Sequence, residues 1–238
     1  MKILVIAAHP DDEVLGMGGT IKKYTKAGNQ VKIIIMATGI HARRSDKNKN
    51  STQYKVKKTI TDSMKNQVKQ LQKDAKKSAK ILGVNDIEFK DFPDNEMDTI
   101  SSLKITKTIE EVIEKFNPEI VYTHSPHDVN IDHKIIYNST ITATRPISSK
   151  VKEVISFEIP SSTEWNFHQI FSPNMFVDIS KELQNKLDAM AAYKLELRDF
   201  PHPRSIKALE SIASRWGSVS GFHFAEAFCL IRSLKKSI

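Results

Sequence analysis

Histidine and carboxylate side chains gather in two short segments of the chain, residues 9–13 (HPDDE) and residues 128–133 (DVNIDH). Neutral imidazole and carboxylate are donors that Zn²⁺ and similar divalent ions bind. Because adjacent residues point in different directions, Asp12 can bind a metal while Asp11 faces a water molecule beside it. The two segments together therefore predict a divalent metal site that serves hydrolysis.

Each segment has an alternative interpretation when it is taken alone. Residues 9–13 could form an acidic turn at a helix start, where the helix dipole favours carboxylates. The spacing of Asp128, Asn130 and Asp132 resembles the opening of a calcium loop, but the sequence has His133 where that loop needs glycine. We therefore exclude calcium. We expect the dipole at a helix start to keep His133 neutral, as a metal ligand must be.

The glycine-rich segment 16–19 (GMGG) raises the question of a nucleotide site. It lacks the full glycine spacing of a dinucleotide-binding turn, and the acidic residues 11–13 before it would repel a pyrophosphate. We expect these glycines to let a helix pack closely on a sheet instead. The chain contains neither a GxxxxGK[ST] phosphate-binding motif nor a GxSxG serine motif.

The pattern of apolar residues predicts strands that alternate with helices. Continuous apolar runs such as residues 2–8 are typical of buried parallel strands, and the alternation is typical of βαβ units. The predicted fold class is therefore α/β, a Rossmann-like, mostly parallel sheet with helices on both faces and a small C-terminal appendage, in a single domain over residues 1–238. The predicted strands are 2–8, 30–37, 86–90, 119–123, 151–159 and 174–178, and the predicted helices are 14–26, 64–82, 99–115, 133–144, 180–198 and 203–216. Residues 40–63 are predicted to be a polar loop, and the less regular residues 146–177 could form the antiparallel appendage. Residues 222–232 could be strand or helix.

Ligands bind outside the carboxyl ends of the strands in such sheets. His9 follows the first predicted strand, Asp94 and Asn95 follow the third, and residues 128–133 follow the fourth. The residues that could bind a metal therefore stand where the fold brings strand ends together. This convergence is stronger evidence for a site than either segment alone.

Composition narrows the classes of partner. The chain has a formal net charge of +8, much of it from residues 43–80, but Tyr54 is the only aromatic residue in that run. Nucleic-acid binders usually interleave aromatic residues with the charge, so we expect a solvated face or an anionic substrate and no nucleic acid. The apolar run 3–8 is too short for a membrane span or a signal peptide, and Cys229 has the apolar neighbours of a buried thiol. We expect a cytoplasmic protein without membrane insertion.

Three motifs resemble the PIG-L/LmbE family of metal-dependent N-acetyl deacetylases: residues 7–13 (AAHPDDE), residues 16–20 (GMGGT) and the pair Asp132-His133. The resemblance covers essentially the whole chain in its order of elements and is specific at these motifs. It implies a Rossmann-like sheet, N-acetylated amino-sugar substrates that are free or carried on a nucleotide or lipid, and a chain that is often oligomeric. It also implies that a zinc ion, or another divalent metal, is held by His9, Asp12 and His133, and that Asp11 is the general base.

The second motif departs from the family at one position. Many members read His-x-Asp-His there, and the first of these histidines helps to stabilise the oxyanion. Asn130 stands at that position here, and asparagine can donate a hydrogen bond but cannot supply a proton. Either Asn130 is a weaker donor or a nearby histidine replaces it, with His127 the first choice and His124 and His223 behind it.

Other stretches resemble a branch of the family associated with polysaccharides and natural products, and they suggest substrate-binding residues. Arg204 follows a rigid turn and could hold a carboxylate or phosphate, or it could form a structural salt bridge. Trp165 could stack on a sugar face or fill the core. The stretches are Asp94-Asn95, residues 161–165 (SSTEW), residues 201–205 (PHPRS) and residues 225–228 (AEAF).

The resulting hypothesis is hydrolysis of an N-acetyl group on an amino sugar, with Asp11 accepting a proton from the attacking water. A non-catalytic, metal-dependent sugar-binding module is the main alternative, and Asn130 motivates it. Nucleotide binding by residues 16–19 and nucleic-acid binding by the lysine-rich run are the further alternatives.

Overall fold

The computed structural model describes residues 1–37 and 62–235. Its centre is a seven-stranded sheet in the order β3-β2-β1-β4-β5-β7-β6. Strands β1 to β5 pair in parallel, β7 runs antiparallel to β5, and β6 runs antiparallel to β7. The strands are β1 Lys2–Ala7, β2 Gln30–Ala37, β3 Asp86–Phe92, β4 Ile120–His124, β5 Glu153–Phe157, β6 Met175–Asp178 and β7 Ala225–Ser233.

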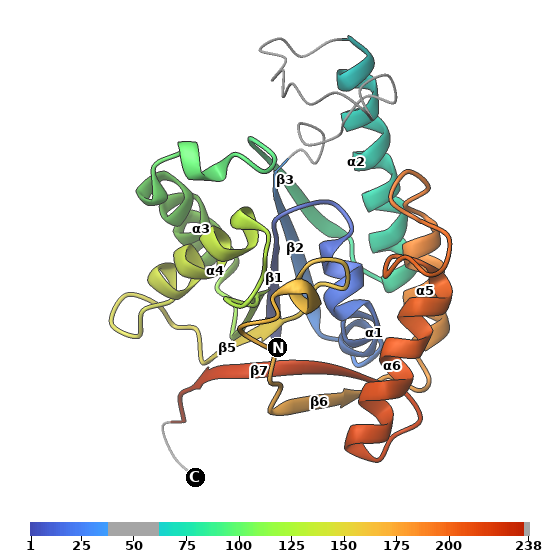
Figure 1. Ribbon diagram of the computed structural model, residues 1–238. Helices are drawn as coiled ribbons and strands as arrows, with labels where there is room; N and C mark the ends of the chain where they lie inside the picture. Colours follow the sequence, from blue (N-terminus) through green and yellow to red (C-terminus); the bar gives the residue numbers. More distant parts are fainter. Residues whose placement is uncertain (38–61, 236–238) are drawn as a thin grey trace.

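Helices cover both faces of this sheet (Figure 1). Among the described residues, no helix is long and apolar enough to cross a membrane. The predicted loop over 40–63 and the first part of the lysine-rich run lie almost entirely outside the described residues. Within residues 1–37 and 62–235, the α-helices are α1 Asp12–Lys26, α2 Asp62–Leu82, α3 Ser102–Phe116, α4 Ile131–Ala143, α5 Leu183–Ala191 and α6 Ile206–Ser220, and the short 3₁₀ turns are η2 Met97–Thr99 and η3 Thr163–Trp165.

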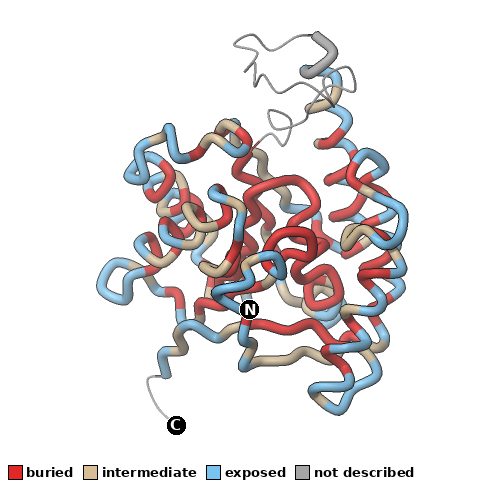
Figure 2. Tube along the Cα trace, viewed as in Figure 1, coloured by how far each residue is buried: buried red, intermediate tan, exposed pale blue. Residues whose placement is uncertain are grey.

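The alternation of side chains along β1 explains the two layers of helices. Ile3 and Val5 pack into a core with α1, α2, α5 and α6, whereas Leu4 and Ile6 pack into a second core with α3 and α4. Successive side chains of a strand point to opposite faces, so a strand that is apolar throughout needs cover on both sides. Figure 2 shows the result, a buried centre between helices whose outer surfaces are exposed.

The α/β fold predicted from the sequence is confirmed, and its C-terminal part is more closely joined to the sheet than expected. The segment 151–159 contributes β5, a fifth parallel strand, and residues 222–232 form β7 rather than a helix. Residues 146–177 therefore form no separate antiparallel appendage: they contribute the parallel strand β5 and most of the edge strand β6 to the same sheet. The helix predicted over 180–198 is shorter in the structure, where α5 spans Leu183–Ala191. The turn that follows places the Tyr193 hydroxyl against the carboxylate of Glu13.

The prediction of a buried thiol at Cys229 is wrong, because this residue is only partly buried. Strand β6 covers β7 as far as Phe228, where its pairing begins with Met175. Cys229 lies beyond that cover, and its thiol donates a hydrogen bond to the carbonyl oxygen of Ser172 at 3.1 Å.

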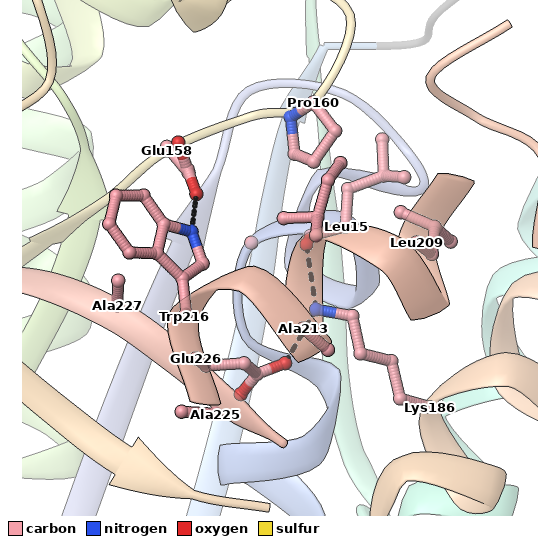
Figure 3. A pocket seen from close by; sticks show the side chains of 12 residues that line it. Leu15, Glu158, Pro160, Lys186, Leu209, Ala213, Trp216, Ala225, Glu226 and Ala227 are labelled. Carbon is pink, nitrogen blue, oxygen red and sulfur yellow. Dashed lines mark hydrogen bonds and ion pairs between the residues drawn. The ribbon is translucent and has the colours of Figure 1, made fainter. Parts of the chain in front are cut away.

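The glycine-rich segment lies inside α1, which departs from helical geometry at Met17. Beyond that break the backbone N–H groups of Gly19 and Thr20 donate to the two carboxylate oxygens of Glu226 at 3.0 and 2.7 Å. Nζ of Lys186 lies 2.6 Å from the same carboxylate (Figure 3). Two of the backbone N–H groups that a phosphate would need as donors are therefore already bonded to an internal carboxylate. A Cβ atom on Gly19 would lie 2.8 Å from the side chain of Ile179, so the close packing expected of these glycines is observed.

Candidate active site

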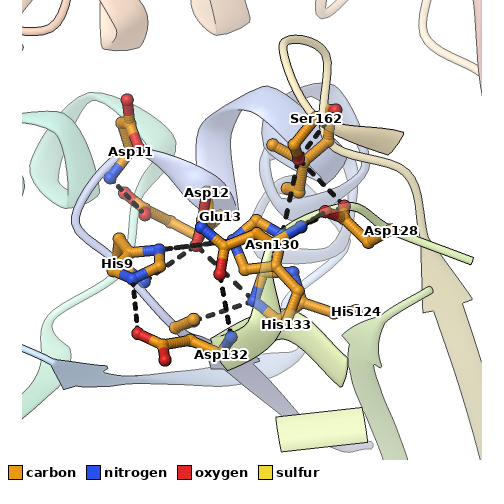
Figure 4. A network of polar contacts seen from close by, with 12 residues as sticks. His9, Asp11, Asp12, Glu13, His124, Asp128, Asn130, Asp132, His133 and Ser162 are labelled. Carbon is orange, nitrogen blue, oxygen red and sulfur yellow. Dashed lines mark hydrogen bonds and ion pairs between the residues drawn. The ribbon is translucent and has the colours of Figure 1, made fainter. Parts of the chain in front are cut away.

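The candidate site lies at the carboxyl ends of β1 and β4. Strand β1 pairs with β2 on one side and with β4 on the other, so the chain leaves these two strands in opposite directions. Such a switch point leaves a crevice in which α/β proteins bind their ligands. Residues 9–13 follow β1 and residues 125–133 follow β4, and the two segments meet in this crevice (Figure 4).

Three side chains from these segments direct donor atoms at one point. Nδ1 of His9 lies 3.2 Å from Nε2 of His133. Oδ2 of Asp12 lies 3.4 Å from Nδ1 of His9 and 3.3 Å from Nε2 of His133. All three residues are buried. The fold thus brings together the three residues that the sequence predicted as metal ligands, in a group that could hold a metal ion.

The spacing of these donor atoms fits a tetrahedral zinc ion. Two ligands that are about 2.0–2.1 Å from a tetrahedral zinc lie about 3.3 Å from each other. Oδ1 of Asp12 is also buried and lacks a hydrogen-bond partner among the described residues, which is consistent with an oxygen close to a cation. Two imidazole nitrogens and one carboxylate leave a fourth position for water or substrate, as in catalytic zinc sites.

Each of the two histidines has a carboxylate on its other ring nitrogen. Nδ1 of His133 lies 3.0 Å from Oδ2 of Asp128. Nε2 of His9 lies 3.0 Å from Oδ2 of Asp132 and 3.1 Å from Oδ1 of Asp94. Such carboxylates orient a metal-ligating histidine and raise its basicity. Sequence reasoning assigned no role to Asp128 and Asp132, although acids that recur close to a ligand histidine are the signal that could have found them.

These carboxylates make the cluster attract positive charge. Burial lowers the pKa of His133, but Asp12 and Asp128 outweigh burial and raise this pKa to about 9. Burial also lowers the pKa of His9, and Asp12, Asp132 and Asp94 raise it well above its usual value. The prediction of a neutral His133 considered only the helix dipole, whereas Asp12 and Asp128 also favour positive charge at this ring. A metal ion bound to Nε2 would supply that charge while the imidazole itself acts as a neutral ligand.

Asp11 lies beside the cluster and is fully buried, with a left-handed backbone φ of 107°. Burial raises its pKa, the Arg204 guanidinium lowers it, and Asp12 and Glu13 raise it, with a net value of about 7. A carboxyl group with a pKa near neutrality suits a general base. The backbone N–H of Asp11 donates to Oε2 of Glu13 at 3.2 Å, and the Tyr193 hydroxyl donates to the other oxygen of Glu13. Glu13 and Tyr193 therefore stabilise the turn that contains Asp11. Sequence reasoning did not predict a role for either residue.

Asn130 is the N-cap of α4. Its Oδ1 accepts the backbone N–H of Asp132 at 2.8 Å, and its Nδ2 donates to Oδ1 of Asn95 at 2.9 Å. Both ends of this amide are thus engaged, and the preference of asparagine for helix N-caps was the sequence signal for this role. The half-buried ring of His127 pairs through Nδ1 with Oε1 of Gln169 at 3.2 Å, and its Nε2 has no partner in the part of the chain that the structure describes.

His124 is buried beneath the cluster. Its ring stacks on that of His133, with centroids 4.0 Å apart and an interplanar angle of 13°, and its Nε2 accepts the backbone N–H of Ala8 at 2.8 Å. Burial and the neighbouring His133 lower the pKa of His124 well below its usual value, so this ring is neutral. His124 therefore supports the ligand ring and the end of β1. His223 is exposed on the turn before β7.

The predicted substrate-binding residues lie in three different surroundings. Asp94 is buried against His9, and the exposed Asn95 donates its Nδ2 to Oδ1 of Asp94 at 3.0 Å. Trp165 is 48% exposed, so the alternative that it fills the core is wrong. The η3 turn is anchored by the buried Thr163, and Trp165 at the end of this short turn faces solvent.

Arg204 faces carboxylates of its own chain. Its Nη1 lies 3.1 Å from Oδ2 of Asp11 and 3.1 Å from Oε2 of Glu196, and its Nε donates to Oγ of Ser161 at 2.9 Å. Of the two roles that the sequence left open for Arg204, this geometry corresponds to the internal ion pair. The site therefore combines a three-donor cluster for a cation with a buried carboxylate that is itself held by an arginine, an arrangement that can activate water for hydrolysis.

Sequence comparison relates this chain to known deacetylases. The family model described as PIG-L, GlcNAc-PI de-N-acetylase, matches residues 4–144. The diacetylchitobiose deacetylase of Thermococcus kodakarensis is 28% identical over 232 residues, which cover 94% of this chain and 81% of that protein. A probable N-acetyl-alpha-D-glucosaminyl L-malate deacetylase 2 of Bacillus cereus is 25% identical over 193 residues, which cover 81% of this chain and 82% of that protein.

Structural comparison supports the same relationship at the level of the fold. The N,N'-diacetylchitobiose deacetylase of Pyrococcus horikoshii superimposes with a TM-score of 0.76 and 21% identity, over 97% of this chain and 84% of the other. The segment matched by the family model includes both parts of the metal cluster and amounts to more than half of the chain. This chain therefore belongs to the PIG-L (GlcNAc-PI de-N-acetylase) family.

Proposed function

We propose that this chain is a metal-dependent N-deacetylase that converts an N-acetylated amino sugar and water into acetate and the free amino sugar. The observation that carries the proposal is the set of donor atoms from His9, Asp12 and His133, which lie 3.2 to 3.4 Å apart beside the buried carboxylate of Asp11. The names of the relatives support an amino-sugar substrate. A zinc ion held by the three donors would polarise the acetyl carbonyl and acidify water.

The remaining steps fall to side chains of the chain. Asp11 accepts a proton from the attacking water, and the amide C–N bond breaks as the nitrogen receives a proton and leaves as an amine. Of the two groups expected opposite the metal, His127 is the better candidate to deliver this proton, because an imidazolium can transfer a proton whereas an amide cannot, and Nε2 of His127 is free of partners among the described residues. Both ends of the Asn130 amide are engaged, so its contribution is limited to a hydrogen bond.

The substrate is proposed to enter over the exposed rim of the crevice. Trp165 offers an exposed aromatic face for stacking on a sugar ring. Asn95 is exposed beside Asp94, although both ends of its amide are already bonded, to Asp94 and to Asn130. The sugar is either free or linked to a nucleotide or a lipid. We also propose that the chain assembles into a homo-oligomer, because the resemblance to the family implies it.

The test combines metal analysis with an activity screen. The purified protein is analysed for zinc and then incubated with N-acetyl amino sugars that are free, nucleotide-linked or lipid-linked. Release of acetate and amine in equal amounts, lost on chelation and restored by zinc, is the expected result. Zinc and sugar binding without acetate release from any of the three groups would instead favour the sugar-binding module that Asn130 suggested.

A further inference from the structure

The general base of the proposed reaction is held by an arginine from a distant part of the chain. Nη1 of Arg204 lies 3.1 Å from Oδ2 of Asp11. Arg204 belongs to the segment between α5 and α6, outside the residues 4–144 that the family model matches. We propose that Arg204 is a positioning residue that fixes the carboxylate of Asp11 in the orientation needed to accept a proton from water. This inference rests on the proposed function, in which Asp11 is the base.

The backbone of Asp11 explains why this base needs support. Its φ of 107° is left-handed, a conformation that residues with a side chain rarely adopt. The surrounding structure must therefore hold it. Glu13 holds the backbone N–H of Asp11 at 3.2 Å, and Arg204 holds the carboxylate. The base is thus fixed at both its main chain and its side chain.

Arg204 is itself anchored on both sides. Its Nε donates to Oγ of the buried Ser161 at 2.9 Å, and its Nη1 lies 3.1 Å from Oε2 of the buried Glu196. Ser161 follows β5 and Glu196 follows α5, so the guanidinium ties two loops to the turn after β1. The hydrogen bonds to Ser161 and Glu196 fix the planar guanidinium in direction, which a lysine ammonium, a single point charge, could not reproduce. The guanidinium held in this way places its positive charge beside the carboxylate of Asp11 as an ion pair.

A role as a clamp for an anionic substrate fits the surroundings less well. The guanidinium already faces two buried carboxylates, those of Asp11 and Glu196, and a substrate anion would meet their negative charge. The two roles predict different kinetics. Loss of a substrate contact raises KM, whereas loss of alignment of the base lowers kcat.

The experiment compares Arg204→Met and Arg204→Lys with Arg198→Met, each alone and combined with Asp11→Asn. Arg198 is the matched control, since it is exposed in the same segment and, within the described residues, its guanidinium donates only to the carbonyl oxygens of Leu195 and Leu197. Acetate release, bound zinc and Tm are measured for every variant. If Arg204→Met unfolds below the assay temperature, Arg204→Lys takes its place in the comparison.

We expect Arg204→Met to lower kcat roughly 10- to 100-fold, with KM, zinc content and the Arg198→Met control nearly unchanged. In the Asp11→Asn background the same change should have almost no further effect. Equal losses of kcat in both backgrounds, or a rise in KM alone, would overturn the inference.

A crystal structure of Arg204→Met tests the inference without turnover. A displaced Asp11 carboxylate is expected there, and an unmoved one would overturn the inference. If the wild-type protein releases no acetate, the proposed function fails, and this structure still decides whether Arg204 positions Asp11.

Discussion

Oδ2 of Asp128 lies 3.0 Å from Nδ1 of His133 and also accepts the hydroxyl groups of Ser162 and Thr163 at 2.9 and 2.7 Å. The loop after β5 therefore fixes a carboxylate that in turn fixes a ligand histidine. Loss of such a partner typically weakens metal binding by roughly 10- to 100-fold. We predict that Asp128→Asn weakens zinc binding by about this factor, measured by competition with a chromophoric chelator.

The matched control for this prediction is Asp98→Asn, since Asp98 is exposed on η2. Its zinc affinity should equal that of the unchanged protein. An Asp128→Asn variant with the affinity of the control would show that the carboxylate does not support the metal site.

Mutation should separate the role of Asp11 as general base from the role of the metal ligands. Asp11→Asn removes the proton acceptor but leaves the donors of His9, Asp12 and His133 in place. We predict nearly full zinc content and a fall in kcat of roughly 100-fold or more, as expected for loss of a general base. His133→Ala is the contrasting variant and should lose zinc and activity together. Near-normal turnover of Asp11→Asn would remove Asp11 from the proposed mechanism.

The buried pair of Lys186 and Glu226 should matter for stability. Lys186 is 2.6 Å from Glu226 and also donates to the carbonyl oxygen of Leu15 at 2.9 Å. Lys186→Met leaves a buried carboxylate without its cation, which costs about 3–5 kcal/mol in comparable cases. We predict a loss of this order in the free energy of unfolding, measured by urea denaturation.

The combined variant Lys186→Met with Glu226→Gln tests the cause of that loss. It should be less destabilised than the sum of the two single changes, because it leaves no unpaired charge. Lys181→Met, at an exposed position just before α5, is the control. Additive losses would mean that the two charges do not act as a pair.

The metal cluster was predictable because histidine and aspartate side chains are typical metal ligands and because strand ends meet at one edge of an α/β sheet. His9 and His133 stand directly after predicted strands or at a predicted helix start, so their convergence followed from the order of elements. By contrast, no sequence pattern indicated that the carboxylate of Glu226 accepts the backbone N–H of Gly19, 207 positions away in sequence. Periodicity identifies the face of an element, but not which distant side chain satisfies a particular backbone group.

Irregular segments limited the prediction in a second way. Trp165 lies in a short 3₁₀ turn, and Arg204 lies just before α6, although the sequence predicted that this helix begins at residue 203. Neither the burial nor the partners of these two residues could therefore be inferred from periodic spacing. Asn130 was interpreted by its position in a family motif, whereas its local role is to cap α4. The preference of asparagine for this position is a local rule, and it applies here independently of the family.

Glu158 provides a pH-dependent test of the packing between β5 and α6. Its carboxylate accepts the indole N–H of Trp216 in a partly buried position (Figure 3). Burial raises the pKa of Glu158, Trp216 lowers it, and the net value is about 7 against 4.5 for an ordinary glutamate. Below the ordinary value both the folded and the unfolded chain hold the proton. As pH rises toward 7 the unfolded chain loses it first, so the contribution of Glu158 to stability falls over this window and stays low above it.

Glu158→Gln keeps an acceptor for Trp216 and removes the ionisation, so its stability should lack this pH dependence. We predict that the free energy of unfolding of the wild type, relative to this variant, decreases by up to about 3 kcal/mol between pH 5 and pH 8. Urea denaturation at both pH values measures the difference. Glu210→Gln, at an exposed position of α6, controls for the general effect of removing one carboxylate. A pH-independent difference between wild type and Glu158→Gln would mean that Glu158 titrates at the same pH in the folded and the unfolded chain.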